Sequence, residues 1–484
     1  MKVSVIDLGY NSLKLVNYEV KRDKSFAAYG QKSILARLGE GLDETGFLGD
    51  QAIKRAIKAL KLFREIVDLQ RVNHVLPIAT SAVREAGNKA PFLKQAVRET
   101  GFGFKVLSEK EEAIYSFAGA RAALDVKSGL FFDLGGGSLE MVLFENSTIR
   151  KILSVPLGGL RLTDLYSRNS GEFSGKNYAR MRKRILELLP GTKDLPTDEK
   201  LELVGVGGTV RAIARFDQIR DGYPVNKLHN YELRRASVES IQQTLRKMTP
   251  KEIRKIPAIG QDRARSMVAG SLVVQLLMES IGFRRLIVST HGVRDGVLSA
   301  FLEDPIAYRK GSLQSVVQRA SNHNPLQTTH SRDLIESLFS GGIMSKRERN
   351  ILRQASSQIP NLPLTNPETL FYDVLECDST LSHPDQIIMA LALAKSQGMK
   401  RADWLQATYQ DLLDENVEET VERVSSMVSL LNILEKTGSR LNIRFVGRRK
   451  LRVRLEQGQK HFPAELFKDT LDDVQDAFSL KISI

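Results

Sequence analysis

The sequence predicts an α/β protein with two duplicated half-domains that flank a cleft, followed by a mainly helical C-terminal domain. Three observations lead to this fold class. Strand-like and helix-like segments alternate through the first 300 residues, one loop sequence occurs twice within that alternation, and the pattern becomes helical after about residue 305. The predicted domains of the 484-residue chain are 1–125, 126–302 and 311–484, with the last boundary in the segment 303–311.

The alternation rests on two kinds of segment. Residues 49–69 and 111–124 place apolar residues at three- and four-residue steps, as amphipathic helices do. Runs rich in β-branched residues predict strands at 2–9, 12–20, 74–80, 104–109, 129–136, 138–146, 201–208 and 284–290. Beyond residue 305 most segments have helical spacing, and residues 441–458 alternate in a way that predicts a hairpin.

The cysteine content and the apolar segments indicate which cellular compartment to expect. The single cysteine, Cys377, excludes an internal disulfide and fits a reducing compartment. The N-terminus enters a strand-like run at once, without the features of a signal peptide. The longest apolar stretch, 271–283, is too short to span a bilayer. We therefore expect a soluble, cytoplasmic protein without a membrane partner.

Charge is unevenly distributed along the chain. Residues 1–300 hold 48 Lys and Arg against 33 Asp and Glu, a net charge of +15, whereas residues 301–484 hold 23 against 24. Such an excess favours polyanionic partners: nucleic acid, an anionic membrane or a phosphate-rich substrate. A lysine-rich surface that only keeps the protein soluble would have the same composition.

One internal repeat supports the duplication. DLGYNSLKLVNYE (7–19) and DLGGGSLEMVLFE (133–145) align without a gap at an offset of 126 residues, with seven of thirteen positions identical. Both copies have the order strand, Asp, glycine-containing turn, strand. Two related half-domains explain this better than chance does, and each turn would point into the cleft between the halves.

The residue types in these turns suit a phosphate and its metal. Glycine-rich turns expose successive backbone N–H groups to an anion, and Asn11, Ser12 and Ser138 add side-chain donors. Asp7 and Asp133 repel phosphate, but they can bind Mg²⁺, which takes one or two carboxylates together with water and phosphate oxygens. The alternative is a pair of tight hairpins with an aspartate in each turn; the presence of two copies favours the phosphate clamp.

A third glycine-rich segment, 203–214, has the order strand, turn, helix. Its residues Gly207, Gly208 and Thr209 would turn helix N-terminal amides toward an anion. Glycines required only for packing would give the same pattern.

Eight motifs, in order along residues 1–300, resemble the exopolyphosphatase/guanosine pentaphosphate phosphohydrolase family of the actin-like and sugar-kinase superfamily. They are DLGYNS (7–12), ATSAVREAGN (79–88), SEKEEA (108–113), DLGGGSLE (133–140), VPLGGLRLT (155–163), VGVGGT (204–209), RARSMVAG (263–270) and STHGVRDGVL (289–298). HSRDLIESLF (330–339), the closing hairpin and its terminal helix resemble the long form of this family. The resemblance implies two actin-like (ribonuclease H-like) half-domains, a phosphoanhydride hydrolase of exopolyphosphatase type and a homodimer.

The resemblance also implies roles for individual residues. Glu112 corresponds to the catalytic base that activates water for in-line attack on a terminal phosphoryl group; a helix-start glutamate favoured by the helix dipole is the alternative. Asp133 and Glu140 correspond to metal-binding and catalytic carboxylates, and Asp7 lies on the facing loop as a further metal ligand. Arg84 corresponds to a phosphate-contacting arginine, with a solvent-facing residue as the alternative.

Backbone and side-chain donors complete the implied substrate site. The phosphate loop and its partner on the first half correspond to Gly135, Gly136, Gly137 and Ser138 and to Asn11 and Ser12, and the third glycine segment adds Gly208 and Thr209.

Two departures from the family pattern fall in the site. Tyr10 stands where serine is usual, and Glu109 where glycine is usual. We expect the Tyr10 ring at the cleft mouth, with weaker or altered phosphate contact. If the glycine of relatives has a positive φ, the backbone at Glu109 must differ.

The C-terminal domain departs further. Long family members resemble metal-dependent His-Asp phosphohydrolases there, but none of the seven histidines of this chain is followed by aspartate. We predict a degenerate domain without a metal-dependent site, which extends the polyanion path or supports a dimer. Deletion of residues 311–484 should then shift chain-length preference or oligomeric state.

These inferences predict an exopolyphosphatase that uses Mg²⁺, or Mn²⁺ in its place, to remove terminal phosphate from inorganic polyphosphate. The charge of the first 300 residues favours this long polyanion over the alternative substrate, guanosine pentaphosphate or another nucleotide. A superfamily kinase or ATPase is a second class, which Glu112 disfavours. A non-catalytic phosphate-ligand sensor or nucleic-acid binder is a third class. The complete carboxylate set disfavours a protein without catalysis, and the lack of an aromatic-rich basic stripe disfavours nucleic-acid binding.

Overall fold

The computed structural model describes residues 1–167, 171–189, 201–260, 263–313, 316, 329–359, 366–399, 403–447, 449–456 and 464–483. The chain separates into two compact units, Met1–His323 and Asn324–Ile484. The predicted boundary segment, 303–311, therefore lies within the first unit.

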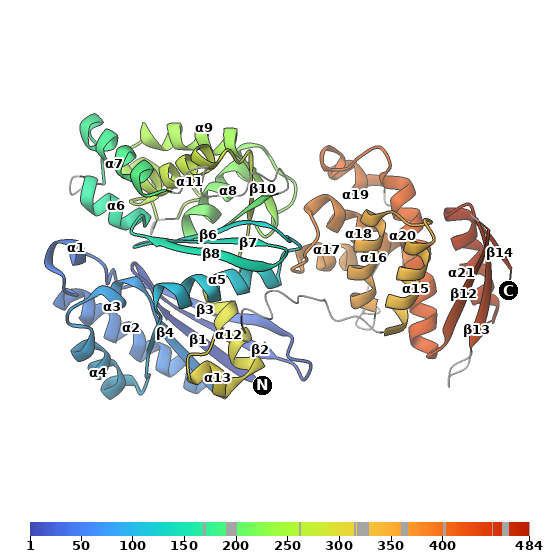
Figure 1. The fold of residues 1–484 in the computed structure, drawn as a ribbon, viewed down its shortest axis with the longest axis horizontal. Coiled ribbons are helices and arrows are strands. Elements are labelled where there is room, and N and C mark those ends of the chain that lie inside the picture. Colours follow the sequence, from blue (N-terminus) through green and yellow to red (C-terminus); the bar gives the residue numbers. More distant parts are fainter. Residues whose placement is uncertain are drawn as a thin grey trace. The chain divides into compact units, whose positions relative to one another are not determined.

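The first half of this unit is built on a five-stranded sheet in the order β3-β2-β1-β4-β5 (Figure 1). β1 and β2 form an antiparallel hairpin, and β4 pairs with β1 in parallel. One face of the sheet packs against α2 and α4, where Phe63 and Phe92 join Ile6, Leu13 and Leu15 in a single core. The elements are β1 (Lys2–Leu8), β2 (Ser12–Val20), β3 (Phe26–Leu35), α1 (Leu42–Thr45), α2 (Asp50–Leu69), β4 (His74–Ala79), α3 (Ser81–Glu85), α4 (Lys89–Thr100) and β5 (Lys105–Val106).

The second half repeats this arrangement around a six-stranded sheet in the order β10-β11-β9-β6-β7-β8. Here β6 and β7 form the antiparallel hairpin and β9 pairs with β6 in parallel, as β1, β2 and β4 do in the first half. The shared topology supports the duplication that the repeated loop predicts. The elements are β6 (Gly129–Leu134), β7 (Leu139–Glu145), β8 (Thr148–Val155), α6 (Gly159–Tyr166), α7 (Gly175–Leu188), β9 (Glu202–Val206), α8 (Gly208–Arg220), β10 (Tyr231–Arg234), α9 (Arg235–Arg246), α10 (Pro250–Ile253), α11 (Met267–Ile281) and β11 (Arg285–Val288).

Two helices, α5 (Glu109–Ala122) and α12 (Val293–Glu303), lie between the sheets (Figure 1). They pack backbone to backbone, because a Cβ on Gly119 would lie 2.2 Å from the Gly292 carbonyl oxygen and one on Gly296 would lie 1.9 Å from that of Tyr115. α12 also contacts β1, and a short helix, α13 (Pro305–Arg309), follows it. Most of α12 lies in the predicted range 126–302, and the helix contacts β1 of the first half.

The second unit is mainly helical and ends in a small sheet. α18 is buried along almost its whole length, from Gln386 to Ala394, and packs against α16, α17 and α20. The strands of the sheet lie in the order β12-β13-β14. The elements are α15 (Thr329–Ser340), α16 (Lys346–Gln358), α17 (Pro367–Glu376), α18 (His383–Ser396), α19 (Asp403–Thr408), the 3₁₀ helix η3 (Gln410–Leu412), α20 (Val417–Thr437), β12 (Arg440–Gly447), β13 (Lys450–Glu456), α21 (Ala464–Ala477) and β14 (Lys481–Ser483).

The predicted strands and the two predicted amphipathic helices are confirmed, with boundaries that differ by a few residues. The closing hairpin is confirmed as β12 and β13; Arg448, Gln457 and Gly458 of its predicted range lie outside the described residues. Strands β3, β8, β10 and β14 are additions that the sequence patterns did not predict. In the described part of the chain, no helix combines the length and the apolar character that crossing a membrane requires.

Candidate active site

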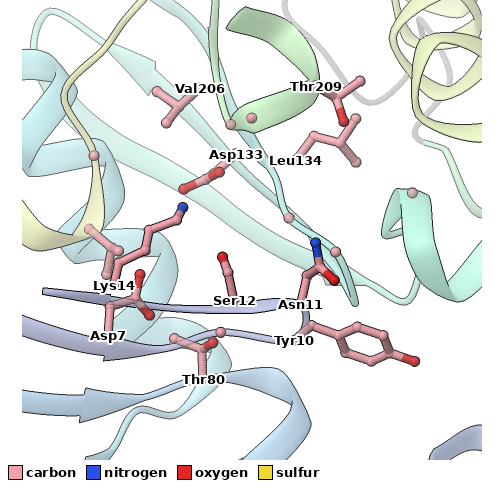
Figure 2. A pocket seen from close by; sticks show the side chains of 18 of the residues that line it. Asp7, Tyr10, Asn11, Ser12, Lys14, Thr80, Asp133, Leu134, Val206 and Thr209 are labelled. Atoms are coloured by element: carbon pink, nitrogen blue, oxygen red, sulfur yellow. The ribbon is translucent and has the colours of Figure 1, made fainter. Parts of the chain in front are cut away.

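A polar pocket opens between the two halves, where the β1–β2 and β6–β7 turns approach each other (Figure 2). Loops from both sheets, the N-terminus of α8 and the start of α12 contribute to its wall. Ten of the predicted site residues line it: Asp7, Asn11, Ser12, Glu112, Asp133, Gly135, Gly136, Ser138, Gly208 and Thr209. The structure thus brings both repeated turns and the third glycine segment to one cavity.

The start of α5 directs Glu112 toward this pocket. Ser108 caps the helix, and its capping box uses the Glu111 carboxylate, which also pairs with Lys105 at 2.9 Å. The Glu111 carboxylate is therefore engaged in the hydrogen bonds of the helix cap, whereas Glu112 lines the cavity. Burial raises the pKa of Glu112 to about 7, against the opposing effect of the Arg84 guanidinium. A carboxyl with this pKa can accept a proton near neutral pH.

Arg84, at the end of α3, is a partner of Glu112. Its Nη1 donates to Glu112 Oε2 at 2.8 Å and to the Leu107 carbonyl at 2.9 Å. The Nε and Nη2 atoms of Arg84 are buried without a hydrogen-bond partner in the described part of the chain. Arg84 is absent from the pocket lining, so its established contact here is with the candidate base. Its predicted phosphate contact stays a prediction.

The β6–β7 hairpin places two carboxylates opposite each other. Asp133 and Glu140 are direct cross-strand partners, so their side chains share one face of the sheet. Ser116 Oγ donates to Asp133 Oδ2, and Ser154 Oγ donates to Glu140 Oε1 at 3.3 Å. Burial raises the pKa of both carboxyls, and the charge of Glu112 raises that of Glu140 further.

The β1–β2 hairpin carries a different pair at the same place. Asp7 lies directly opposite Lys14, a pocket-lining residue that the sequence analysis missed. Burial lowers the pKa of Lys14 to about 7, and the nearby Arg294 contributes to this effect. The repeat alignment held the signal for Lys14, because it occupies the position of Glu140 in the other copy.

Three arginines complete a cationic wall that the sequence analysis also missed. Arg211 comes from the first turn of α8, Arg263 precedes α11, and Arg294 lies in the first turn of α12. Burial lowers the pKa of Arg211 to about 10, helped by the charges of Arg294 and Arg263. The side chains of Lys14, Arg211 and Arg294 form no hydrogen bond or ion pair with the described residues, so their charges are available to an anion. All three arginines lie within glycine-containing motifs of the sequence, and these motifs could have indicated that the arginines belong to the site.

The carboxylates suit a Mg²⁺ ion. No three His, Cys, Asp or Glu side chains among the described residues form a preformed metal cage. Mg²⁺ does not require one, since it binds through one or two carboxylates, water and phosphate oxygens. Glu140 is buried and does not itself line the pocket, whereas Asp133 beside it is partly buried and does line it. Burial raises the pKa of both carboxyls, so a nearby cation would stabilise their charged forms. These two residues would hold the ion, with Asp7 close enough to Asp133 to raise its pKa.

Close packing of the turns requires several of the glycines. Gly207 has a φ of 120°, and a Cβ there would lie 2.3 Å from the Leu134 carbonyl oxygen. Gly137 is absent from the pocket lining, and a Cβ there would lie 2.4 Å from the Tyr10 ring. What lies close to Gly137 is thus an aromatic ring, and phosphate binding by this residue stays a prediction.

Tyr10 lines the pocket, as expected, but its ring is buried. The residue is only 4% exposed, because the ring packs against Gly39 and Gly137. Burial, with the charge of Asp43, raises the pKa of its phenol. Glu109 is the first residue of α5 and does not have a positive φ.

Comparisons with known proteins identify the family to which the chain is similar. The Ppx/GppA phosphatase family matches residues 20–304. The chain is similar to exopolyphosphatase 2 of Mycobacterium tuberculosis, with 29% identity over 312 residues that cover 61% of this chain and 97% of that protein. It is 27% identical over 312 residues to a bifunctional 3-dehydroquinate synthase/phosphatase of Fusobacterium nucleatum. That match covers 62% of this chain and 46% of the relative, so the chain spans less than half of that protein.

Solved structures show the same similarity. An exopolyphosphatase from Cytophaga hutchinsonii matches with a TM-score of 0.58 and 25% identity, over 63% of this chain and 98% of that one. A Ppx/GppA family member from Aquifex aeolicus matches with a TM-score of 0.53 and 27% identity, over 63% and 98% of the two chains. The predicted fold class, with two actin-like halves and a helical C-terminal region, is confirmed. Because the family match spans more than half of the sequence, this chain belongs to the Ppx/GppA phosphatase family.

Proposed function

We propose that this protein is an exopolyphosphatase that hydrolyses the terminal phosphoanhydride bond of inorganic polyphosphate. One observation carries the proposal: a largely buried carboxylate, Glu112, shares a cavity with four cationic side chains, Lys14, Arg211, Arg263 and Arg294. A catalytic base beside a cationic wall suits attack by water on a chain of phosphates.

Glu112 accepts a proton from water, and the water oxygen forms a bond to the terminal phosphorus. The bridging P–O bond breaks, the shortened chain leaves with the electron pair, and orthophosphate is released. Arg84 holds Glu112 in place through its 2.8 Å contact. Bound Mg²⁺ would neutralise phosphate charge beside Asp133 and Glu140.

The cationic wall stabilises the negative charge on the phosphoryl oxygens, and the turn amides and hydroxyl groups orient the terminal phosphate. Asn11 and Ser12 on one side and Gly135, Gly136 and Ser138 on the other supply these donors. Positioning and charge stabilisation are the main contributions that a protein makes to phosphoryl transfer. Gly208 and Thr209 would add donors at the N-terminus of α8.

The test compares long-chain polyphosphate and guanosine pentaphosphate as substrates. Phosphate release would be measured with wild type and Glu112→Gln, with Mg²⁺ and with chelator. Glu111→Gln is a matched control, because Glu111 belongs to the helix cap and lies one residue away. We expect a higher kcat/KM on polyphosphate, a loss of about 10²–10⁴-fold in kcat for Glu112→Gln and less than about threefold for Glu111→Gln.

Equal activity of Glu112→Gln and wild type would remove Glu112 as the base. A higher kcat/KM on guanosine pentaphosphate would assign the nucleotide as substrate, and transfer of phosphate to an added acceptor would indicate a kinase. Activity that persists in chelator would contradict the use of Mg²⁺ or Mn²⁺. The homodimer and the cytoplasmic location stay predictions, which light scattering and cell fractionation would test.

A further inference from the structure

The side chain of Tyr10 lines the pocket and packs between its own loop and the phosphate loop of the second half. Figure 2 shows its ring directed away from Lys14 and Asp133. A Cβ on Gly137 would lie 2.4 Å from this ring, and a Cβ on Gly39 would lie 2.2 Å from it. The ring thus fills the space between the two glycines, and a side chain at either position would clash with it. The loop of the first half is packed through this ring against the loop of the second.

Arg161 joins the same two halves by charge. It lies in α6 of the second half and is 4% exposed, and its side chain pairs with Asp43 and Glu85 of the first half. The Nε atom of Arg161 donates to Asp43 Oδ2 at 3.1 Å, and the Tyr10 hydroxyl donates to the same oxygen at 3.2 Å. The Arg161 guanidinium carbon lies 5.6 Å from the centroid of the Tyr10 ring. Tyr10, Asp43, Glu85 and Arg161 form the inter-loop cluster.

The backbone connects this cluster to the phosphate loop. The N–H groups of Leu160 and Arg161 both donate to the Gly136 carbonyl at 3.0 Å. On the other side, the Tyr10 carbonyl accepts from the Gly39 N–H at 2.9 Å. Arg161 therefore holds the second loop through its backbone and the first half through its side chain. None of the four cluster members is a candidate base, metal ligand or phosphate ligand.

We propose that Tyr10 and Arg161 are positioning residues that hold the two phosphate loops at the separation required to bind the terminal phosphate. The kinetic part of this inference rests on the proposed function. Weakening the cluster lowers the fraction of molecules whose loops are correctly placed before substrate binds, and the apparent affinity falls by that fraction. Bound substrate restores the arrangement, so KM changes more than kcat.

The test uses the full-length protein and four variants. Tyr10→Ala removes the ring, Tyr10→Phe removes only the hydroxyl contact with Asp43, and Asp43→Asn weakens the ion pair with Arg161. Phe63→Leu is the matched control, because Phe63 is a fully buried aromatic residue of the same core that does not line the pocket. Steady-state kinetics with polyphosphate would be combined with hydrogen exchange of the segments 9–12 and 135–138.

We expect Tyr10→Ala and Asp43→Asn to raise KM about tenfold, with kcat within about threefold of wild type. The hydrogen-exchange rate of both segments should rise in these two variants. The KM and the exchange rate of Tyr10→Phe should lie between their values and those of wild type. Phe63→Leu should lower Tm without changing KM or loop exchange. Unchanged loop exchange in Tyr10→Ala and Asp43→Asn, or equal KM shifts in Phe63→Leu, would overturn the inference. Inactive wild type with the expected exchange pattern would instead refute the proposed function alone.

Discussion

Lys14 and Glu140 occupy equivalent positions in the two hairpins that border the cleft, and each lies directly opposite an aspartate. The partner of Lys14 is Asp7 on β1, and the partner of Glu140 is Asp133 on β6. Directly opposed residues of an antiparallel pair point to the same face. One hairpin therefore presents opposite charges and the other presents two carboxylates. This asymmetry suits a cleft in which one side faces phosphate and the other faces a metal ion.

The acidic limb of the pH–rate profile should follow Glu112. Its pKa, raised by burial to about 7, means that the carboxyl is protonated and inactive as a base below that pH. The kcat/KM for phosphate release should rise about tenfold per pH unit up to about pH 7 and then flatten. Arg84→Gln should move this limb to higher pH, because the Arg84 charge lowers the pKa of Glu112. A limb at the ordinary glutamate pKa would contradict this assignment.

The alkaline limb should follow Lys14. Burial lowers the pKa of its ammonium group to about 7, so the free enzyme loses this positive charge as pH rises through that value. Substrate affinity should then weaken, and KM for polyphosphate should rise above pH 7. Lys14→Arg should abolish this rise, because arginine stays charged. Lys14→Met should raise KM about tenfold or more at pH 6.5, and a pH-independent KM in wild type would contradict the prediction.

Glu140 should destabilise the folded protein at neutral pH when metal is absent. Its pKa in the folded state is raised above the unfolded value by burial and by the charge of Glu112, so the folded protein binds the proton more tightly. Proton binding to Glu140 therefore stabilises the folded protein fully at pH values below the unfolded-state pKa. This stabilisation is lost as the pH rises through the folded-state pKa. In chelator at pH 8, Glu140→Gln should therefore melt at a higher temperature than wild type, and the difference should shrink toward pH 4.

Mg²⁺ gives this experiment a second readout. Adding the ion should raise the Tm of wild type but not that of Glu140→Gln, while kcat of the variant should be about 10²-fold or more below wild type. Glu145→Gln is the control, since Glu145 lies at the end of the same strand and pairs with Arg150. A wild-type Tm that does not respond to Mg²⁺ would argue against a metal at this hairpin.

The second unit should influence chain-length preference or oligomeric state rather than the chemistry. The deleted segment should begin at residue 324 rather than at residue 311, because Leu313 and Val316 pack with the core of the first unit. A protein ending at His323 should retain kcat on short polyphosphate within about threefold. Its preference for long chains, or its mass by light scattering, should change. Unchanged values for both would contradict a role of the second unit in either property.

The sequence by itself determined the two-half α/β fold, the placement of most strands and the identity of the central carboxylates. These features depend on local patterns: β-branched runs, helical spacing, and a loop that occurs twice with seven identities in thirteen positions. Glu112, Asp133 and Asp7 could be named because each lies in a short motif, and the structure brings all three to one cavity. Glu140 could be named in the same way, and the pairing of β6 with β7 places it against Asp133.

Only the tertiary structure decided which other residues reach the cleft. Lys14, Arg211, Arg263 and Arg294 are spread over 281 positions of the chain, and only the approach of the two sheets places them around one cavity. The same holds for Arg161, whose charge partners, Asp43 and Glu85, belong to the other half. The position of the Tyr10 ring depends on a glycine 127 residues away. Such contacts follow from long-range packing, for which no local sequence pattern exists.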